Sequence, residues 1–257
     1  MLRVIPRLDI KGPNLIKSIS FEGLRVLGAP EDFARRYYEG GADELLFMDT
    51  VASLYQRGQF IDLINRVASE VFIPIIVCGG VKSLEDMEVL LRNGADKIGM
   101  NTAAIKDPSL ITRGAEVFGR QCMVASIEAK RVGAGLWECY TDNGREKTGL
   151  DAVQWAMKAE SLGAGEILVT SVDNDGTRLG FDVGLVRSIC RAVSVPVIAS
   201  GGAGKAADIV QLLGDANPSA VCVGSMLHYG LATMQTLKTA LAHEGVNVRI
   251  VLPEKFT

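Results

Sequence analysis

Two acidic side chains lie where the sequence predicts that buried strands end. Asp9 stands in the apolar run Val4–Ile10, and Glu128 follows the run Cys122–Ile127. Because side chains alternate along a strand, the apolar neighbours of each acid indicate that both carboxyls face the inside of the fold. Positioned carboxyl groups act as general acids and bases, and neither of the two histidines stands in a pattern typical of catalysis. We therefore predict that Asp9 and Glu128 are catalytic, with two solvated rim carboxylates as the alternative.

Two further segments could contact a substrate. Lys17 lies in Lys11–Gly28, whose length, Gly and Pro content and mixed polarity fit a mobile lid. A lid lysine could stabilise negative charge that develops on the substrate, although a solvated loop lysine is the alternative. Asp175 and Gly176 belong to the polar turn 173–177, beyond the sixth predicted strand. We expect substrate contact there, unless the turn is an ordinary connection.

Glycine pairs and small polar residues follow four other predicted strands. The first half contributes Gly79, Gly80, Asn101 and Thr102, and the second half contributes Gly201, Gly202, Gly224 and Ser225. Glycine lets backbone N–H groups approach phosphate oxygens, and the N-terminus of a following helix favours an anion. Two matched sets predict a substrate with two phosphates, one bound by each half. Tight turns alone are the alternative.

All these candidates follow short β-branched runs that alternate with amphipathic helical segments. The predicted strands are Val4–Ile10, Glu44–Asp49, Ile73–Val77, Lys97–Met100, Cys122–Ile127, Glu166–Thr170, Pro196–Ala199 and Ala220–Val223. The predicted helices are Pro30–Tyr38, Phe60–Val71, Ser83–Asn93, Pro108–Phe118, Asp151–Leu162 and Leu185–Ala192. Eight strands with helical crossovers predict a parallel sheet closed into a barrel. Catalytic groups of such barrels lie at the C-terminal ends of the strands. The main interruption, Arg131–Glu146, is expected to be a small excursion on the upper rim.

The chain also repeats itself at half its length. Ile73–Gly80 aligns with Val195–Gly202 at an offset of 201 − 79 = 122 residues. The predicted fold is therefore α/β, a single (β/α)8 TIM barrel domain over residues 1–257. It is expected to be built from two similar (β/α)4 halves, about residues 1–120 and 121–250.

Charged residues open four of the predicted strands at the opposite end of the barrel. They are Arg3, Glu44, Lys97 and Glu166. Their alternating sign predicts a ring of ion pairs across the barrel floor. Such a ring could merely stabilise the fold or could gate a passage, and the residues alone do not separate the two.

Composition limits the class of protein. The net charge of −3 argues against general binding to nucleic acid or membranes, and the sequence contains no apolar run long enough to span a bilayer. No Cys/His pair has zinc-ligand spacing, so we expect neither a metal nor a cofactor. The first residues form a strand pattern rather than a signal peptide, which predicts a cytoplasmic protein.

Several stretches together resemble the cyclase subunit of imidazole glycerol phosphate synthase, the HisF family, over about residues 1–250. They include Ile5–Ile10, Asn101–Ala104, Ile127–Arg131, Thr148–Val153, Gly163–Leu168, Asp175–Thr177 and Val195–Gly204. The resemblance implies a lyase and cyclase of histidine biosynthesis. Ammonia from a separate glutaminase subunit (HisH-like) would pass through the barrel to PRFAR, a bisphosphorylated ribulosyl aminoimidazole carboxamide nucleotide. The products would be imidazole glycerol phosphate and AICAR, the aminoimidazole carboxamide nucleotide used in purine synthesis.

The resemblance also implies roles for individual residues. Asp9 and Glu128 match the two acids of the family, and Lys17 matches its lid lysine. The ammonia gate of the family corresponds to Arg3, Glu44, Lys97 and Glu166. Asp96 matches a position near which the glutaminase docks at the barrel floor.

The sequence departs from the family at the mouth of the barrel. Glu128 replaces an aspartate, Arg7 replaces a cysteine, and Val51–Phe60 differs from the usual loop. These changes favour, as an alternative, a HisF-like paralogue that supplies ammonia for acetamidino-sugar synthesis in surface polysaccharides. A non-catalytic scaffold that only docks a glutaminase is a further alternative. A related barrel isomerase needs no ammonia, so the intact floor ring argues against it.

Overall fold

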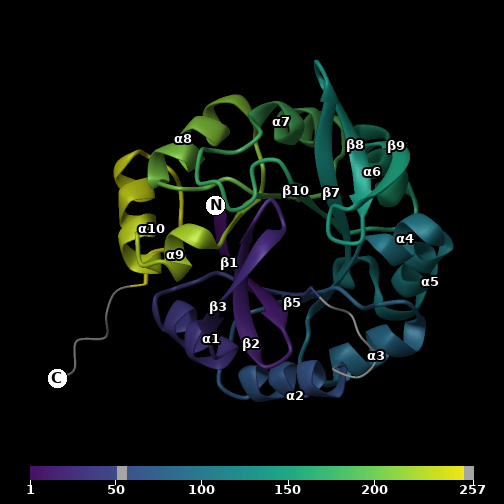
Figure 1. The fold of residues 1–257 in the computed structure, drawn as a ribbon, viewed down its shortest axis with the longest axis horizontal. Coiled ribbons are helices and arrows are strands. Elements are labelled where there is room, and N and C mark those ends of the chain that lie inside the picture. Colours follow the sequence, from purple (N-terminus) through teal and green to yellow (C-terminus); the bar gives the residue numbers. More distant parts are fainter. Residues whose placement is uncertain (51–56, 252–257) are drawn as a thin grey trace.

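A closed barrel of parallel strands forms the centre of the molecule, which is a computed structural model that describes residues 1–50 and 57–251. The barrel strands are β1 (Arg3–Lys11), β4 (Leu45–Asp49), β5 (Ile75–Cys78), β6 (Lys97–Met100), β7 (Met123–Gly133), β10 (Glu166–Ser171), β11 (Val197–Ser200) and β12 (Ala220–Val223). Each pairs in parallel with the next, and β12 pairs with β1 to close the ring. The predicted (β/α)8 barrel is therefore confirmed (Figure 1).

Helices surround the barrel in an outer ring. The longer ones are α1 (Pro30–Glu39), α2 (Arg57–Ala68), α3 (Leu84–Arg92), α5 (Ser109–Phe118), α6 (Ala152–Ser161), α7 (Val183–Ala192), α8 (Ala206–Asp215) and α10 (Met234–His243). Short helical turns are α4 (Thr102–Lys106), η1 (Arg120–Cys122) and α9 (Ser225–His228). Ser83 caps α3 as its sequence indicates, because its side chain accepts a hydrogen bond from the Asp86 N–H. The sequence analysis did not predict α8 and α10.

Side chains of the barrel strands alternate between two apolar layers. On β1, Val4, Leu8 and Ile10 belong to the large cluster that includes the helices. Ile5 belongs instead to a second cluster without helical residues, which fills the barrel interior. Its other members are Leu46, Met48, Ile76, Cys78, Val124, Leu168, Ile198, Ala220 and Cys222. Odd-numbered residues of β1 therefore face the lumen, which places Arg3 at the floor and Asp9 at the mouth.

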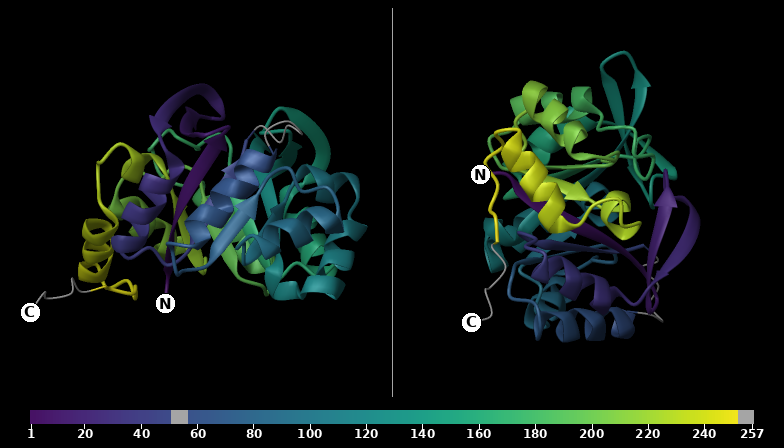
Figure 2. Two further views of the ribbon diagram at one scale, coloured as in Figure 1. Left: turned by 90° about the horizontal axis from the view of Figure 1, so that it is seen from below. Right: turned by 90° about the vertical axis from the view of Figure 1, so that its left-hand side faces the viewer.

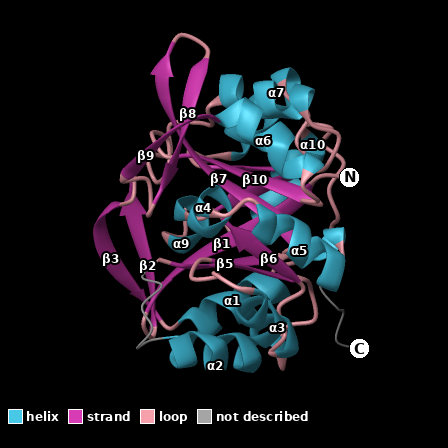
Figure 3. Cartoon of the chain, turned by 90° about the vertical axis from the view of Figure 1, so that its right-hand side faces the viewer, coloured by secondary structure: helices cyan, strands magenta, loops and turns pink. Residues whose placement is uncertain are grey.

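The two halves repeat each other in three dimensions. β5 and β11 begin 197 − 75 = 122 residues apart, and α3 and α8 begin 206 − 84 = 122 residues apart. The first strand of each half also continues into antiparallel strands. β1 is followed by β2 (Asn14–Ile19) and β3 (Glu22–Gly28), and β7 by β8 (Leu136–Thr141) and β9 (Glu146–Asp151). Both extensions rise from the same end of the barrel (Figures 2 and 3).

The segment Lys11–Gly28 is thus a β-hairpin, a form that was not predicted, and its mobility as a lid stays a prediction. Ile19 pairs with Glu22, so the turn consists of two residues. Ser20 and Phe21 adopt φ values of 47° and 67°, a left-handed pair that twists with the strands. This turn lacks the Asn-Gly or Asp-Gly that usually marks such hairpins, so no local pattern predicts it.

Candidate active site

A cavity of about 790 Å³ opens at the C-terminal ends of the barrel strands. Asp9 and Glu128 both line it, although each residue is almost completely buried. The cavity therefore brings together the two carboxyls that the sequence predicted to face inward. Arg7 lines the cavity beside them.

Asp9 is held by two cations. Arg7 Nε donates to its Oδ1 at 2.8 Å, and Lys17 Nζ donates to its Oδ2 at 3.2 Å. Burial alone would raise the pKa of Asp9, but the charges of Arg7 and Lys17 and their hydrogen bonds outweigh it and lower the pKa to about 2. The two cations therefore favour the anionic form of Asp9.

Lys17 joins the hairpin to the barrel. It lies on β2, is 4% exposed, and also donates to Asp175 Oδ2 at 3.0 Å. The Ser20 N–H donates to the carbonyl oxygen of Asp175 at 2.8 Å, so side chain and backbone both fasten the hairpin to the loop after β10. Burial would lower the pKa of Lys17, whereas Asp175 and Asp9 raise it. The predicted candidates Lys17 and Asp175 therefore meet Asp9 directly, and Lys17 is not a solvated loop lysine.

Glu128 has a different environment. Its Oε2 accepts a hydrogen bond from the Gly144 N–H at 2.8 Å, and the Gly144 turn belongs to the β8–β9 extension. Burial raises the pKa of Glu128 to about 7, even though Arg7, Gly144 and Asn101 act to lower it. A carboxyl with a pKa near neutrality can both donate and accept a proton.

Arg7 occupies the centre of the mouth. Its Nη1 donates to Thr170 Oγ1 at 3.2 Å and to Ser200 Oγ at 3.3 Å, and its guanidinium lies over the Phe21 ring at 5.6 Å. Burial would lower the pKa of Arg7, but Asp9 and Asp175 raise it, so the group stays charged. The sequence showed Arg7 only as a departure from the family pattern, and its place on the lumen side of β1 was the signal that could have identified it.

The first of the two predicted phosphate sets lines the cavity. Its members are Gly79, Gly80, Asn101 and Thr102. Both glycines have positive φ, and a Cβ on Gly79 would lie 2.2 Å from the carbonyl oxygen of Asp49. The close approach of these two backbone segments thus requires glycine at position 79, whether or not phosphate binds. Cationic side chains that the sequence analysis missed also line this side of the cavity: Lys82, Lys106 and Arg145.

The second predicted set is not part of this cavity. Gly201, Gly202, Gly224 and Ser225 are absent from its lining. A Cβ on Gly202 would lie 1.9 Å from the carbonyl oxygen of Gly180, and one on Gly176 would lie 2.3 Å from that of Ser18. The loop after β10 therefore covers Gly202 of the second set in this structure, while the first set lines the open cavity.

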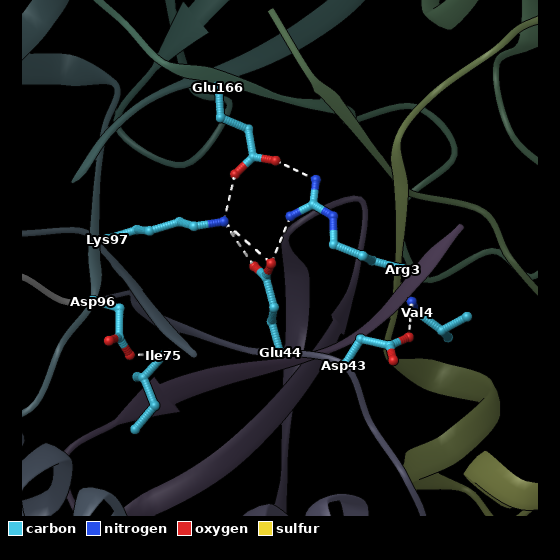
Figure 4. Close-up of polar contacts among 8 residues, drawn as sticks. All are labelled: Arg3, Val4, Asp43, Glu44, Ile75, Asp96, Lys97 and Glu166. Atoms are coloured by element: carbon cyan, nitrogen blue, oxygen red, sulfur yellow. Dashed lines mark hydrogen bonds and ion pairs between the residues drawn. The ribbon is translucent and has the colours of Figure 1, made fainter. Parts of the chain in front are cut away.

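At the opposite end of the barrel, four charged side chains form a closed ring (Figure 4). Arg3 pairs with Glu44 at 2.6 Å and with Glu166, and Lys97 pairs with Glu44 at 3.1 Å and with Glu166 at 2.9 Å. Both carboxylates are buried, and both cations are about one-fifth exposed on their side chains. Burial would lower the pKa of Arg3, but Glu166 and Glu44 raise it. The predicted ring of alternating sign is present, and each charge contacts two of opposite sign.

Asp96 lies beside this ring and already has a structural bond. Its Oδ2 accepts from the Ile75 N–H at 2.8 Å, and Asp43 Oδ2 accepts from the Val4 N–H in the same way (Figure 4). Each acid lies just before a strand and accepts from a backbone N–H at the start of the neighbouring strand. The position of Asp96 at the floor agrees with a docking role without testing it.

No helix among residues 1–50 and 57–251 is long and apolar enough to cross a membrane. In the same part of the chain, no group of three or more His, Cys, Asp or Glu side chains could hold a metal ion. The loop Val51–Phe60, noted as a departure, lies mostly outside the described residues.

Comparisons with known proteins agree with the site. Residues 3–233 match a family described as histidine biosynthesis protein. The chain is 59% identical over 204 residues to the imidazole glycerol phosphate synthase subunit HisF of Legionella pneumophila, covering 79% of this chain and 96% of that protein. It is 49% identical over 248 residues to HisF of Dehalococcoides mccartyi, covering 96% of this chain and 98% of that protein.

Proposed function

Because the chain belongs to the histidine biosynthesis family, as a homologue of the lyase-type HisF subunit of imidazole glycerol phosphate synthase, we propose that it uses ammonia to convert PRFAR to imidazole glycerol phosphate and AICAR. The observation that carries this proposal is the mouth itself. One anionic acid and one acid that titrates near neutrality face a single cavity, next to three basic side chains suited to a phosphate.

The groups at the mouth match what the chemistry requires. The ribulosyl part of PRFAR carries a ketone, and condensation with ammonia forms a C–N bond, breaks the C–O bond and releases water. Two protons must move from the nitrogen to the leaving oxygen, so an acid/base group within reach of both atoms accelerates the step. Glu128 is suited to carry these protons, and Asp9 with Lys17 is suited to stabilise the charges that develop nearby.

The barrel interior supports a route for ammonia. The floor ring of Arg3, Glu44, Lys97 and Glu166 lies at one end. An apolar layer of lumen side chains separates it from the mouth. We include in the proposal a glutaminase (HisH-like) partner that docks at the floor near Asp96 and releases ammonia into this interior. A cytoplasmic location belongs to the same proposal, since the substrate and the partner are expected there.

One specific observation favours a second candidate function. Arg7 lies in the mouth, and the loop after β10 covers Gly202 of the second predicted phosphate set. Both features would suit a HisF-like paralogue that delivers ammonia for acetamidino-sugar synthesis and does not bind PRFAR.

An assay of the purified protein with PRFAR and an ammonium salt at high pH tests the proposal. Loss of substrate absorbance should show turnover, and Asp9→Asn should reduce kcat by at least about 100-fold because it removes the anion opposite Lys17. Asp215→Asn is the matched control, since Asp215 is exposed at the end of α8. Absence of turnover by folded wild-type protein would reject the cyclase and leave the paralogue or the docking scaffold.

A further inference from the structure

The two acids of the mouth differ in how many cations bind them. Each oxygen of Asp9 accepts from its own cation, Oδ1 from Arg7 and Oδ2 from Lys17. The carboxylate of Glu128 instead accepts hydrogen bonds from neutral donors, the Gly144 N–H and the side chain of Asn101. When both oxygens of a carboxylate are paired with buried cations, the charged form is stabilised and protonation is unfavourable.

Arg7 cannot easily turn away from Asp9. It is 4% exposed, and Thr170, Ser200 and the ring of Phe21 hold its other side. These contacts come from β10, from β11 and from the tip of the hairpin, so three separate elements set its position. The pair with Asp9 is therefore built into the barrel.

From this geometry we propose that Arg7 is a positioning residue that keeps Asp9 a permanent anion and so leaves Glu128, rather than Asp9, to carry protons. The proposal deepens the proposed function and rests on it for its catalytic consequence. Asp9 then acts as a fixed negative charge toward substrate, and Glu128 gives up a proton and takes one back during the reaction.

The charged and titratable groups around each acid agree with this division. Asp9 faces Arg7 and Lys17, with Asp175 beyond Lys17 and with His228 on the other side. Burial lowers the pKa of His228 to about 4, so this ring is neutral and adds no charge.

Glu128 faces Arg7, Asp142 and the buried thiol of Cys78. The side chain of Asn101 also hydrogen-bonds it and, like the Gly144 N–H, is a neutral partner.

Carbon-13 NMR of side-chain carboxyls, followed from pH 4 to pH 9, tests the proposal without requiring turnover. Asp9→Asn and Glu128→Gln identify the two signals by their loss. In the wild-type protein the Asp9 signal should not move over this range, and the Glu128 signal should titrate with a midpoint near 7.

Arg7→Met removes the positive charge from a side chain of similar length. Arg7→Lys keeps a positive charge but lacks the planar guanidinium. In Arg7→Met the Asp9 midpoint should rise by roughly 1–3 units, the shift that a neighbouring cation produces in a carboxyl, so that the Asp9 signal moves at the acid end of the range, between about pH 4 and pH 5. In Arg7→Lys it should return toward the wild-type value. With PRFAR and ammonium, the wild-type kcat should depend on one group near pH 7, and Glu128→Gln should remove that dependence.

A wild-type Asp9 signal that titrates between pH 5 and pH 8 would overturn the proposal, whether or not the Arg7 variants fold. So would an Asp9 signal that is unchanged in folded Arg7→Met. If the carboxyls titrate as expected and PRFAR is not turned over, the proposed function fails while the assignment of the charges stands.

Discussion

Glu128 makes the stability of the folded protein depend on pH, and its replacement should reveal this. Burial raises its pKa to about 7 from the ordinary 4.5. Below about pH 4.5 the folded and unfolded states both hold the proton. As the pH rises from there, the unfolded chain loses the proton while the folded protein keeps it up to about pH 7. Stability therefore falls across this interval and stays at the lower level above it.

The size of the effect follows from the two pKa values. The difference, 7 − 4.5 = 2.5 units, corresponds to about 3 kcal/mol at 1.36 kcal/mol per unit. Glu128→Gln keeps the shape and the acceptor for the Gly144 N–H but never ionises. The variant should match the wild type in free energy of unfolding at pH 4.5 and exceed it by about 3 kcal/mol at pH 8.

Urea denaturation of both proteins at pH 4.5 and pH 8 measures this difference. Glu116→Gln is the control, since Glu116 is exposed on α5 and its replacement should change neither value. If Glu128→Gln were no more stable than the wild type at pH 8, or equally more stable at both pH values, the reasoning would be refuted. The same variant should lose most of its turnover, so its added stability would come at the expense of activity.

Two further predictions concern stability. Lys97→Met leaves Glu44 and Glu166 with Arg3 as their one shared cation. The free energy of unfolding should fall by about 3 kcal/mol, which is the low end of the range for breaking a buried ion pair, because Lys97 is partly exposed. Arg92→Ala removes only an exposed pair on α3, so urea denaturation should show a loss below about 0.5 kcal/mol. Gly202→Ala should lower stability by at least about 2 kcal/mol, because its Cβ would collide with a carbonyl oxygen at positive φ. Gly214→Ala, in open space on α8, should be neutral or stabilising by thermal denaturation.

The barrel could be predicted because each strand carries its own signal. Apolar β-branched runs recur at regular spacing, and the offset of 122 residues between halves is visible in the residues alone and again in the strand starts. The hairpin β2–β3 could not be predicted in the same way. Its turn uses Ser20 and Phe21 in left-handed conformations that tertiary contacts maintain, including the bond of the Ser20 N–H to Asp175.

The placement of Asp9 and Glu128 at the mouth could be predicted, but the opposite directions of their pKa shifts could not. The alternation of side chains along β1 and β7 was enough to predict that Asp9 and Glu128 face the lumen. Their opposite pKa shifts depend on which cation reaches which oxygen, and Arg7 and Lys17 reach Asp9 from different strands. The covering of Gly202 in the second phosphate set also depends on contacts between distant segments, which no local pattern encodes.

A structure of Asp9→Asn bound to PRFAR tests the central claim most directly, because this variant should bind the substrate without consuming it. We expect one phosphate at Gly79–Gly80 and 101–102, the other at Gly201–Gly202 and 224–225 after the loop that covers it moves, and the reacting carbon near Glu128. Density that places either phosphate elsewhere, or a mouth that binds no PRFAR, would contradict the account.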